Sequence, residues 1–137
     1  MKWLFLVVLL VSGCSDSIFS PEEDCNCEFE ISSTLPSSDG IYQLEFNASL
    51  AQTYSVLDVS TECGWSQHIQ WDSDYMYNIN GYWTSLVNPA SMTDEDGDGT
   101  IVYGVWEDLR GSTITFYGGY MDDCDNHFVD SVKVFVQ

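Results

Sequence analysis

The chain has 137 residues, with 22 Asp or Glu against 3 Lys or Arg and a formal net charge of −19. A field of this sign repels phosphate backbones, which excludes nucleic acid as a partner, and it attracts cations. The length allows one domain, since little more than a hundred residues follow the N-terminal export region described next.

The N-terminus has the layout of an export signal. Lys2 precedes an apolar run over residues 3–11, which is about half of the 20 or so residues that a membrane-crossing helix needs. The stretch Val11-Ser12-Gly13-Cys14 resembles the lipobox of bacterial lipoproteins, where a peptidase cuts before a cysteine that carries a diacylglycerol. The resemblance implies a cleaved signal peptide, residues 1–13, and a membrane anchor of acyl chains on Cys14. An ordinary secretory signal is the alternative, because it also ends in small residues.

The lipidated Cys14 and a polar tether, together residues 14–24, are expected to join the membrane to one domain, residues 25–137. Ser15, which follows the lipid-bearing cysteine, resembles lipoproteins that are passed on to the outer membrane of Gram-negative bacteria. We therefore expect a cell-envelope protein anchored in the outer membrane. The sequence leaves open whether the domain faces the periplasm or the outside.

Cysteine usage agrees with export. Cys14 is the odd member of five cysteines, and an oxidising compartment predicts that the other four form two disulfides. A bridge from Cys25 to Cys27 would close a strained ring across one residue, so each of them is expected to pair with Cys63 or Cys124, in either order. A metal site built on Cys25 and Cys27 is disfavoured, because it lacks the two-residue spacing typical of zinc sites.

Hydrophobic periodicity predicts strands. Residues 42–50 alternate apolar and polar side chains, and the C-terminal segment places Val132, Val134 and Val136 on one side. Four more strands, rich in β-branched and aromatic residues and separated by turn residues, are expected at 67–71, 82–86, 100–106 and 113–120. No window shows a helical stripe of useful length. The pattern therefore predicts an antiparallel β-sandwich.

The last third of the chain resembles a known family. Gly111-Ser112-Thr113-Ile114-Thr115-Phe116, then Asp123-Cys124-Asp125-Asn126, then residues 130–136 look like the last hairpin of bacterial Ig-like domains of the polycystic-kidney-disease (PKD) type. Trp71-Asp72-Ser73-Asp74 similarly resembles the strand of that family which carries the core tryptophan. The resemblance implies an Ig-like sandwich that acts as an adhesion, spacer or binding module.

One motif points to a metal. The segment from Asp94 to Ile101 resembles the start of an EF-hand-like calcium loop, with carboxylates at Asp94, Asp96 and Asp98 and the carbonyl of Thr100 as expected calcium ligands. Gly99 is expected to permit the sharp turn. The twelfth position holds Val105 instead of the bidentate Glu, so a weak structural site is expected. An ordinary Asp/Gly hairpin turn is the alternative.

A second candidate surface is the segment 71–83, where aromatic rings alternate with Asp and Asn. Flat rings and nearby carboxamides suit sugar recognition. The candidate ligand-binding residues are Trp71, Tyr75, Tyr77, Tyr82 and Trp83. The alternative is that these rings fill the core.

Catalysis has little support, because His68 and His127 stand outside any catalytic motif. The leading hypothesis is a lipid-anchored, non-enzymatic adhesion or interaction module of the cell envelope. A small carbohydrate-binding lipoprotein is the alternative. The expected partner is an envelope protein or a glycan.

Overall fold

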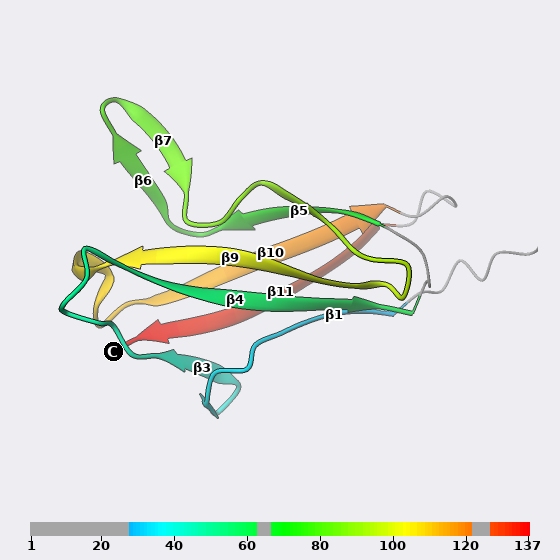
Figure 1. The fold of residues 1–137 in the computed structure, drawn as a ribbon, viewed down its shortest axis with the longest axis horizontal. Coiled ribbons are helices and arrows are strands. Elements are labelled where there is room, and N and C mark those ends of the chain that lie inside the picture. The colour runs from blue at the N-terminus through cyan, green and yellow to red at the C-terminus, as the bar shows by residue number, and fades with distance from the viewer. Residues whose placement is uncertain (1–27, 63–66, 122–126) are drawn as a thin grey trace, which may run out of the picture.

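The computed structural model describes residues 28–62, 67–121 and 127–137. These residues form two facing sheets and a separate two-stranded hairpin (Figure 1), which confirms the predicted all-β class. The described helical structure is one 3₁₀ turn, η1 (Glu107–Leu109). Within these ranges, no helix is long and apolar enough to cross a membrane.

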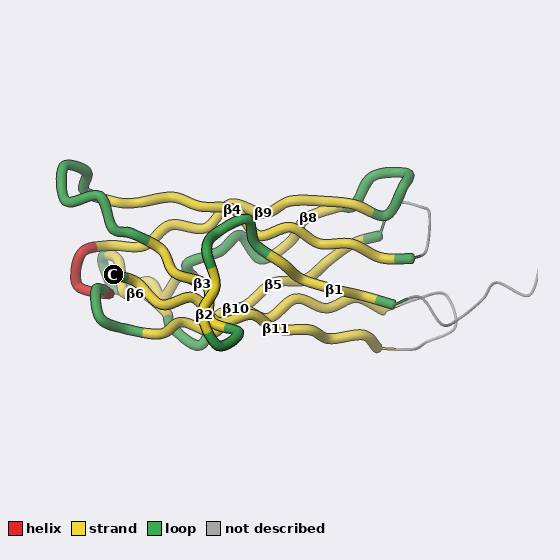
Figure 2. Tube along the Cα trace, turned by 90° about the horizontal axis from the view of Figure 1, so that it is seen from below, coloured by secondary structure: helices red, strands yellow, loops and turns green. Residues whose placement is uncertain are grey.

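The first sheet has three antiparallel strands in the order β1-β4-β9. They are β1 (Phe29–Ser32), β4 (Gln52–Thr61) and β9 (Asp98–Trp106). Their inward side chains include Leu57 of β4 and Val105 of β9, both fully buried. In Figure 2, β4 and β9 lie in one layer and β10 and β11 in the other.

The second sheet has six strands in the order β2-β3-β11-β10-β5-β8. They are β2 (Ser37–Ser38), β3 (Ile41–Leu44), β5 (His68–Ser73), β8 (Ala90–Met92), β10 (Thr113–Met121) and β11 (His127–Val136). Its neighbours are antiparallel except β3 and β11, which run parallel. The fully antiparallel sheet expected from the sequence is therefore wrong at this one pair.

The core lies between the two sheets, as the alternation of side chains dictates. Val134 and Val136 are fully shielded from solvent, and Val132 is nearly so. The rings of Tyr103, from the first sheet, and Phe116, from the second, meet with centroids 4.5 Å apart. The burial of such side chains is the main favourable term in folding.

The predicted strands compare closely with the observed ones in the second half of the chain. The strands expected at 67–71, 82–86, 100–106 and 113–120 match β5, β7 (Tyr82–Ser85), β9 and β10 within about two residues. The final strand starts at His127, three residues earlier than the resemblance implied.

The strand predicted over residues 42–50 is wrong beyond Leu44. Asn47 ends the extended run, because its carbonyl accepts a hydrogen bond from the Leu50 amide (3.0 Å) and its side chain accepts one from the Ser49 amide (3.0 Å). Such local bonds compete with strand pairing. As a result Leu50 is exposed, and the chain turns into β4, which the sequence pattern did not reveal.

The chain enters the sandwich at the end where β1 begins and β4 finishes. There the Glu62 amide donates to the Glu28 carbonyl over 3.0 Å. The ring of Tyr120 contacts Phe29 at 5.3 Å and Phe128 at 5.1 Å, so three aromatic rings fill this end between the sheets. The opposite end holds the start of β4 and the end of β9.

Candidate functional site

Among the described residues, the most exposed aromatic side chains lie on the hairpin of β6 (Met76–Ile79) and β7. Asn80 and Gly81 connect its strands with φ angles of 53° and 88°, which is the two-residue turn that matches strand twist. Figure 1 shows the hairpin standing out from the sandwich. Tyr82 is 79% exposed and Trp83 is 67% exposed.

Tyr77 holds the base of this hairpin against the sandwich. Its ring packs on Trp106 with centroids 4.0 Å apart, and its hydroxyl donates a hydrogen bond to a carboxylate oxygen of Asp108. Burial, and then the Asp108 carboxylate, raise the pKa of Tyr77 well above its usual range, so the hydroxyl stays a neutral donor. The hairpin is thus fixed at one end and free at its tip.

A groove of about 500 Å³ separates the hairpin from the outer face of β4 and β9. We call it the hairpin groove. The segment that follows β7 is attached to β9 at two points along this groove. The Gly104 amide donates a hydrogen bond to the Leu86 carbonyl over 3.2 Å, and Val87 forms a β-bridge with Tyr103. The volume lies within the range of small-molecule sites.

Gly104 shapes the floor of the hairpin groove. A Cβ atom at this position would lie 2.2 Å from Nε2 of Gln52 and 3.0 Å from Cε1 of Tyr54, so only glycine lets both side chains lie across the strand. The Tyr54 hydroxyl donates to the Gln52 carboxamide oxygen. Tyr54 is nevertheless 64% exposed. A ring held in this way presents a flat apolar surface to the groove.

The five aromatic residues proposed from the sequence therefore separate into three environments. Trp71 belongs to the core, since it is 5% exposed, and Tyr77 packs at the hairpin base. Tyr75 is partly exposed beside Tyr77, with ring centroids 5.7 Å apart. Trp83 lines the hairpin groove, whereas Tyr82 does not.

The predicted calcium loop forms the turn between β8 and β9. The carboxylate oxygen Oδ1 of Asp94 accepts hydrogen bonds from the amides of Asp96 (2.9 Å) and Asp98 (3.0 Å). The sharp turn falls at Gly97, whose φ is 85°, and not at Gly99, which lies in β9. In this arrangement the Asp94 side chain stabilises its own turn.

A shallow acidic groove of about 460 Å³ borders this turn. Asp94, Asp98 and Thr100 line it together with Asp58, which pairs with Thr100 across β4 and β9. Asp96 is not part of this lining. Within the described ranges, no three Asp, Glu, His or Cys side chains are placed to hold a metal ion.

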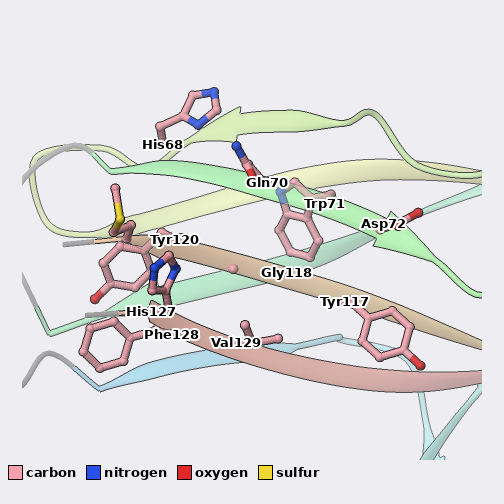
Figure 3. A pocket seen from close by; sticks show the side chains of 12 residues that line it. His68, Gln70, Trp71, Asp72, Tyr117, Gly118, Tyr120, His127, Phe128 and Val129 are labelled. Carbon is pink, nitrogen blue, oxygen red and sulfur yellow. The ribbon is translucent and has the colours of Figure 1, made fainter. Parts of the chain in front are cut away.

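A hollow of about 600 Å³ lies on the outer face of β5, β10 and β11 (Figure 3). Gly119 forms part of its floor, and its walls include His68 and His127. Figure 3 shows the two imidazole rings well apart, with β5 and β10 between them. The histidines therefore do not form one site with each other.

Cys14, Cys25, Cys27, Cys63 and Cys124 lie outside the described residues, as does the export region. The described neighbours of the four domain cysteines converge at one end of the sandwich. Glu28 and Glu62 are hydrogen bonded there, and Met121 pairs with His127. The disulfides stay a prediction.

Sequence reasoning missed Gln52 and Tyr54 because β4 was not predicted, and it missed Gly104 because the predicted strand over 100–106 gave no sign of what packs on its outer face. The alternation of buried Leu57, Val59 and Thr61 was the available signal for β4.

Comparison with protein-family models, with curated proteins and with solved structures gave no match, so function has to be argued from this geometry.

Proposed function

We propose that this protein is a lipid-anchored, non-enzymatic binding module of the bacterial cell envelope, an adhesion or interaction domain that presents the β6–β7 hairpin. The observation that carries the proposal is the exposure of Tyr82 and Trp83 on a hairpin whose base is fixed by Tyr77. Large exposed apolar side chains gathered on one element are typical of interaction sites.

We propose an Ig-like type for the sandwich, similar to PKD-type domains. The orders β1-β4-β9 and β11-β10-β5 correspond to strands A-B-E and G-F-C of Ig-like folds. Trp71 on β5 then occupies the place of the core tryptophan on strand C. Ig-like sandwiches carry their binding sites on loops and hairpins at one end, which agrees with the position of β6 and β7.

The direction of the chain supports a role for the hairpin. An anchor at Cys14 would reach the domain through the end where β1 begins. The hairpin base packs on Trp106, at the far end of the first sheet. The 10 residues of β4 that separate the two ends span about 33 Å. If the anchor is at Cys14, the hairpin would lie on the side away from the membrane.

The anchor is tested by Cys14→Ser. We expect this variant to lose acylation, because only a thiol at this position can form the thioether, and to leave the membrane fraction. Metabolic labelling with an alkyne palmitate, followed by fractionation, measures both effects. Cys63→Ser is the matched control, since it removes a cysteine that is expected in a disulfide and not in a thioether, and it should keep the label. Equal labelling of Cys14→Ser and the native chain would refute the lipoprotein assignment.

We also propose that calcium binds weakly beside the β8–β9 turn. Asp58, Asp94 and Asp98 all line the acidic groove, and a cation that drew their carboxylates together would offset the repulsion between them. Because Asp94 already accepts two backbone hydrogen bonds, binding requires the turn to rearrange. That requirement agrees with a dissociation constant of about 10⁻⁴–10⁻³ M.

Calcium at five times its dissociation constant is expected to stabilise the fold by about 1 kcal/mol. Thermal melts in calcium, magnesium and chelator measure the gain. Asp98→Asn should remove most of it, whereas Asp96→Asn, which changes the same charge outside the groove, should keep it. A melting temperature that rises equally with both cations, or equally in both variants, would mean that ions only screen the acidic surface.

A further inference from the structure

The hairpin groove differs from the rest of the molecule in its charge. None of the residues that line it is Asp, Glu, Lys, Arg or His, although 22 acidic residues are spread over the chain. A charged ligand would therefore find no ion-pair partner in this groove, and an anionic one would also be repelled by the surrounding surface. The occupant that fits is neutral.

The groove offers two aromatic surfaces from separate elements. Tyr54 lies across Gly104 on the floor, and Trp83 reaches the groove from β7. Both rings are more exposed than buried, at 64% and 67% respectively. Apolar faces of this kind suit the flat, weakly polar faces of pyranose rings, whereas the edges of such rings require hydrogen-bond partners.

Polar groups that can hydrogen bond to sugar hydroxyls lie beside these rings. The carboxamide oxygen of Gln52 accepts a hydrogen bond from the Tyr54 hydroxyl, and its Nε2 atom lies over Gly104 on the floor of the groove. Asn88 and Thr84 also line the groove with exposed side chains. Carboxamides and hydroxyls both donate and accept, as sugar hydroxyls do.

We propose that the hairpin groove binds a neutral saccharide, which stacks on Tyr54 and Trp83 and hydrogen bonds to Gln52 and Asn88. The inference rests on the proposed function as a binding module and names its ligand class. The site is largely preformed, because Gly104 and Leu86 are hydrogen bonded and Tyr77 fixes the hairpin base. A preformed site loses little conformational entropy on binding.

The test uses the full chain in detergent and neutral hexasaccharides of glucose, mannose and N-acetylglucosamine, with hexagalacturonate as the anionic probe. Calorimetry and tryptophan fluorescence measure binding. We expect at least one neutral probe to bind and hexagalacturonate not to bind. Trp83→Ala and Tyr54→Ala should each weaken binding at least tenfold. Tyr82→Ala, which removes the adjacent and more exposed ring outside the groove, should change it less than twofold.

Thermal melts of the three variants show whether they remain folded, which is expected because all three side chains are exposed. Equal losses of binding affinity in Tyr82→Ala and Trp83→Ala, or binding of hexagalacturonate alone, would overturn the saccharide site.

A second experiment places a photocrosslinking phenylalanine at position 83 in intact cells. A protein adduct without saccharide binding would overturn this inference and leave the binding module standing. No adduct and no saccharide binding would overturn both.

Discussion

Trp71→Ala is expected to lower the free energy of unfolding by about 3–5 kcal/mol, the usual cost of removing a fully packed large aromatic side chain. Trp71 is 5% exposed, and its indole Nε1 donates to the Ser91 hydroxyl oxygen over 2.7 Å. Gly118, its direct cross-strand partner, leaves room for the ring, since a Cβ there would lie 3.0 Å from Trp71 Cζ3. Gly118 itself has no side chain that could fill the cavity left by alanine.

Trp83→Ala is the matched control, because it makes the same chemical change at an exposed position. Its expected effect on the free energy of unfolding is within about 0.5 kcal/mol. Denaturant unfolding followed by circular dichroism measures both variants on the same scale. Similar destabilisation by the two substitutions would contradict the placement of Trp71 in the core and of Trp83 on the surface.

The different environments of Trp71 and Trp83 could not be predicted from residue composition. Both lie in one stretch of rings and polar residues, and composition alone assigns them the same role. One tryptophan is buried and the other exposed because Asn80 and Gly81, with their positive φ angles, turn the chain into a hairpin that stands out from the sandwich. An Asn-Gly pair between apolar segments is a hairpin signal. Its presence could have been used to separate a core strand, β5, from an exposed hairpin.

The strands that could be predicted are those whose alternation is uninterrupted. Val132, Val134 and Val136 follow a strict period of two and are buried as expected. The same reasoning failed at Asn47, where the predicted strand over residues 42–50 is interrupted. The side chain of Asn47 holds a turn there, although the sequence continues to alternate apolar and polar residues. Local periodicity reports burial on one face and does not report where the chain reverses.

The hairpin groove could not be predicted, because it is built from distant parts of the chain. Tyr54 and Trp83 come together only through the pairing of β4 with β9 and the attachment of Leu86 to Gly104. Neither contact leaves a local pattern. In the acidic turn, by contrast, a local sequence pattern exists but indicated a metal-binding loop. In the structure the Asp94 carboxylate instead accepts hydrogen bonds from the backbone of its own turn.

Peptide mapping without reductant is expected to find the bridges Cys27–Cys63 and Cys25–Cys124. The order follows from the register of β1 and β4, which pairs Phe29 with Thr61. Because Glu28 and Glu62 form a hydrogen-bonded pair, Phe29 and Thr61 form a non-hydrogen-bonded one. In the sequence Cys27 directly precedes Glu28 and Cys63 directly follows Glu62, so the described neighbours of these two cysteines already meet. We therefore expect the first bridge to join them, which leaves Cys25 for Cys124.

The bridges should contribute strongly to stability, because both close long loops in the unfolded chain. For the 37 residues from Cys27 to Cys63, the chain-entropy relation gives about 4 kcal/mol, and for the 100 residues from Cys25 to Cys124 it gives about 5 kcal/mol. The paired variant Cys27→Ala/Cys63→Ala should therefore keep one bridge and melt as a single transition at lower temperature. The mixed variant Cys27→Ala/Cys124→Ala should lose both native bridges and be destabilised more than either matched pair. Equal destabilisation by the matched and mixed variants, or a mapped Cys25–Cys63 bridge, would show that the register of β1 and β4 does not set the pairing.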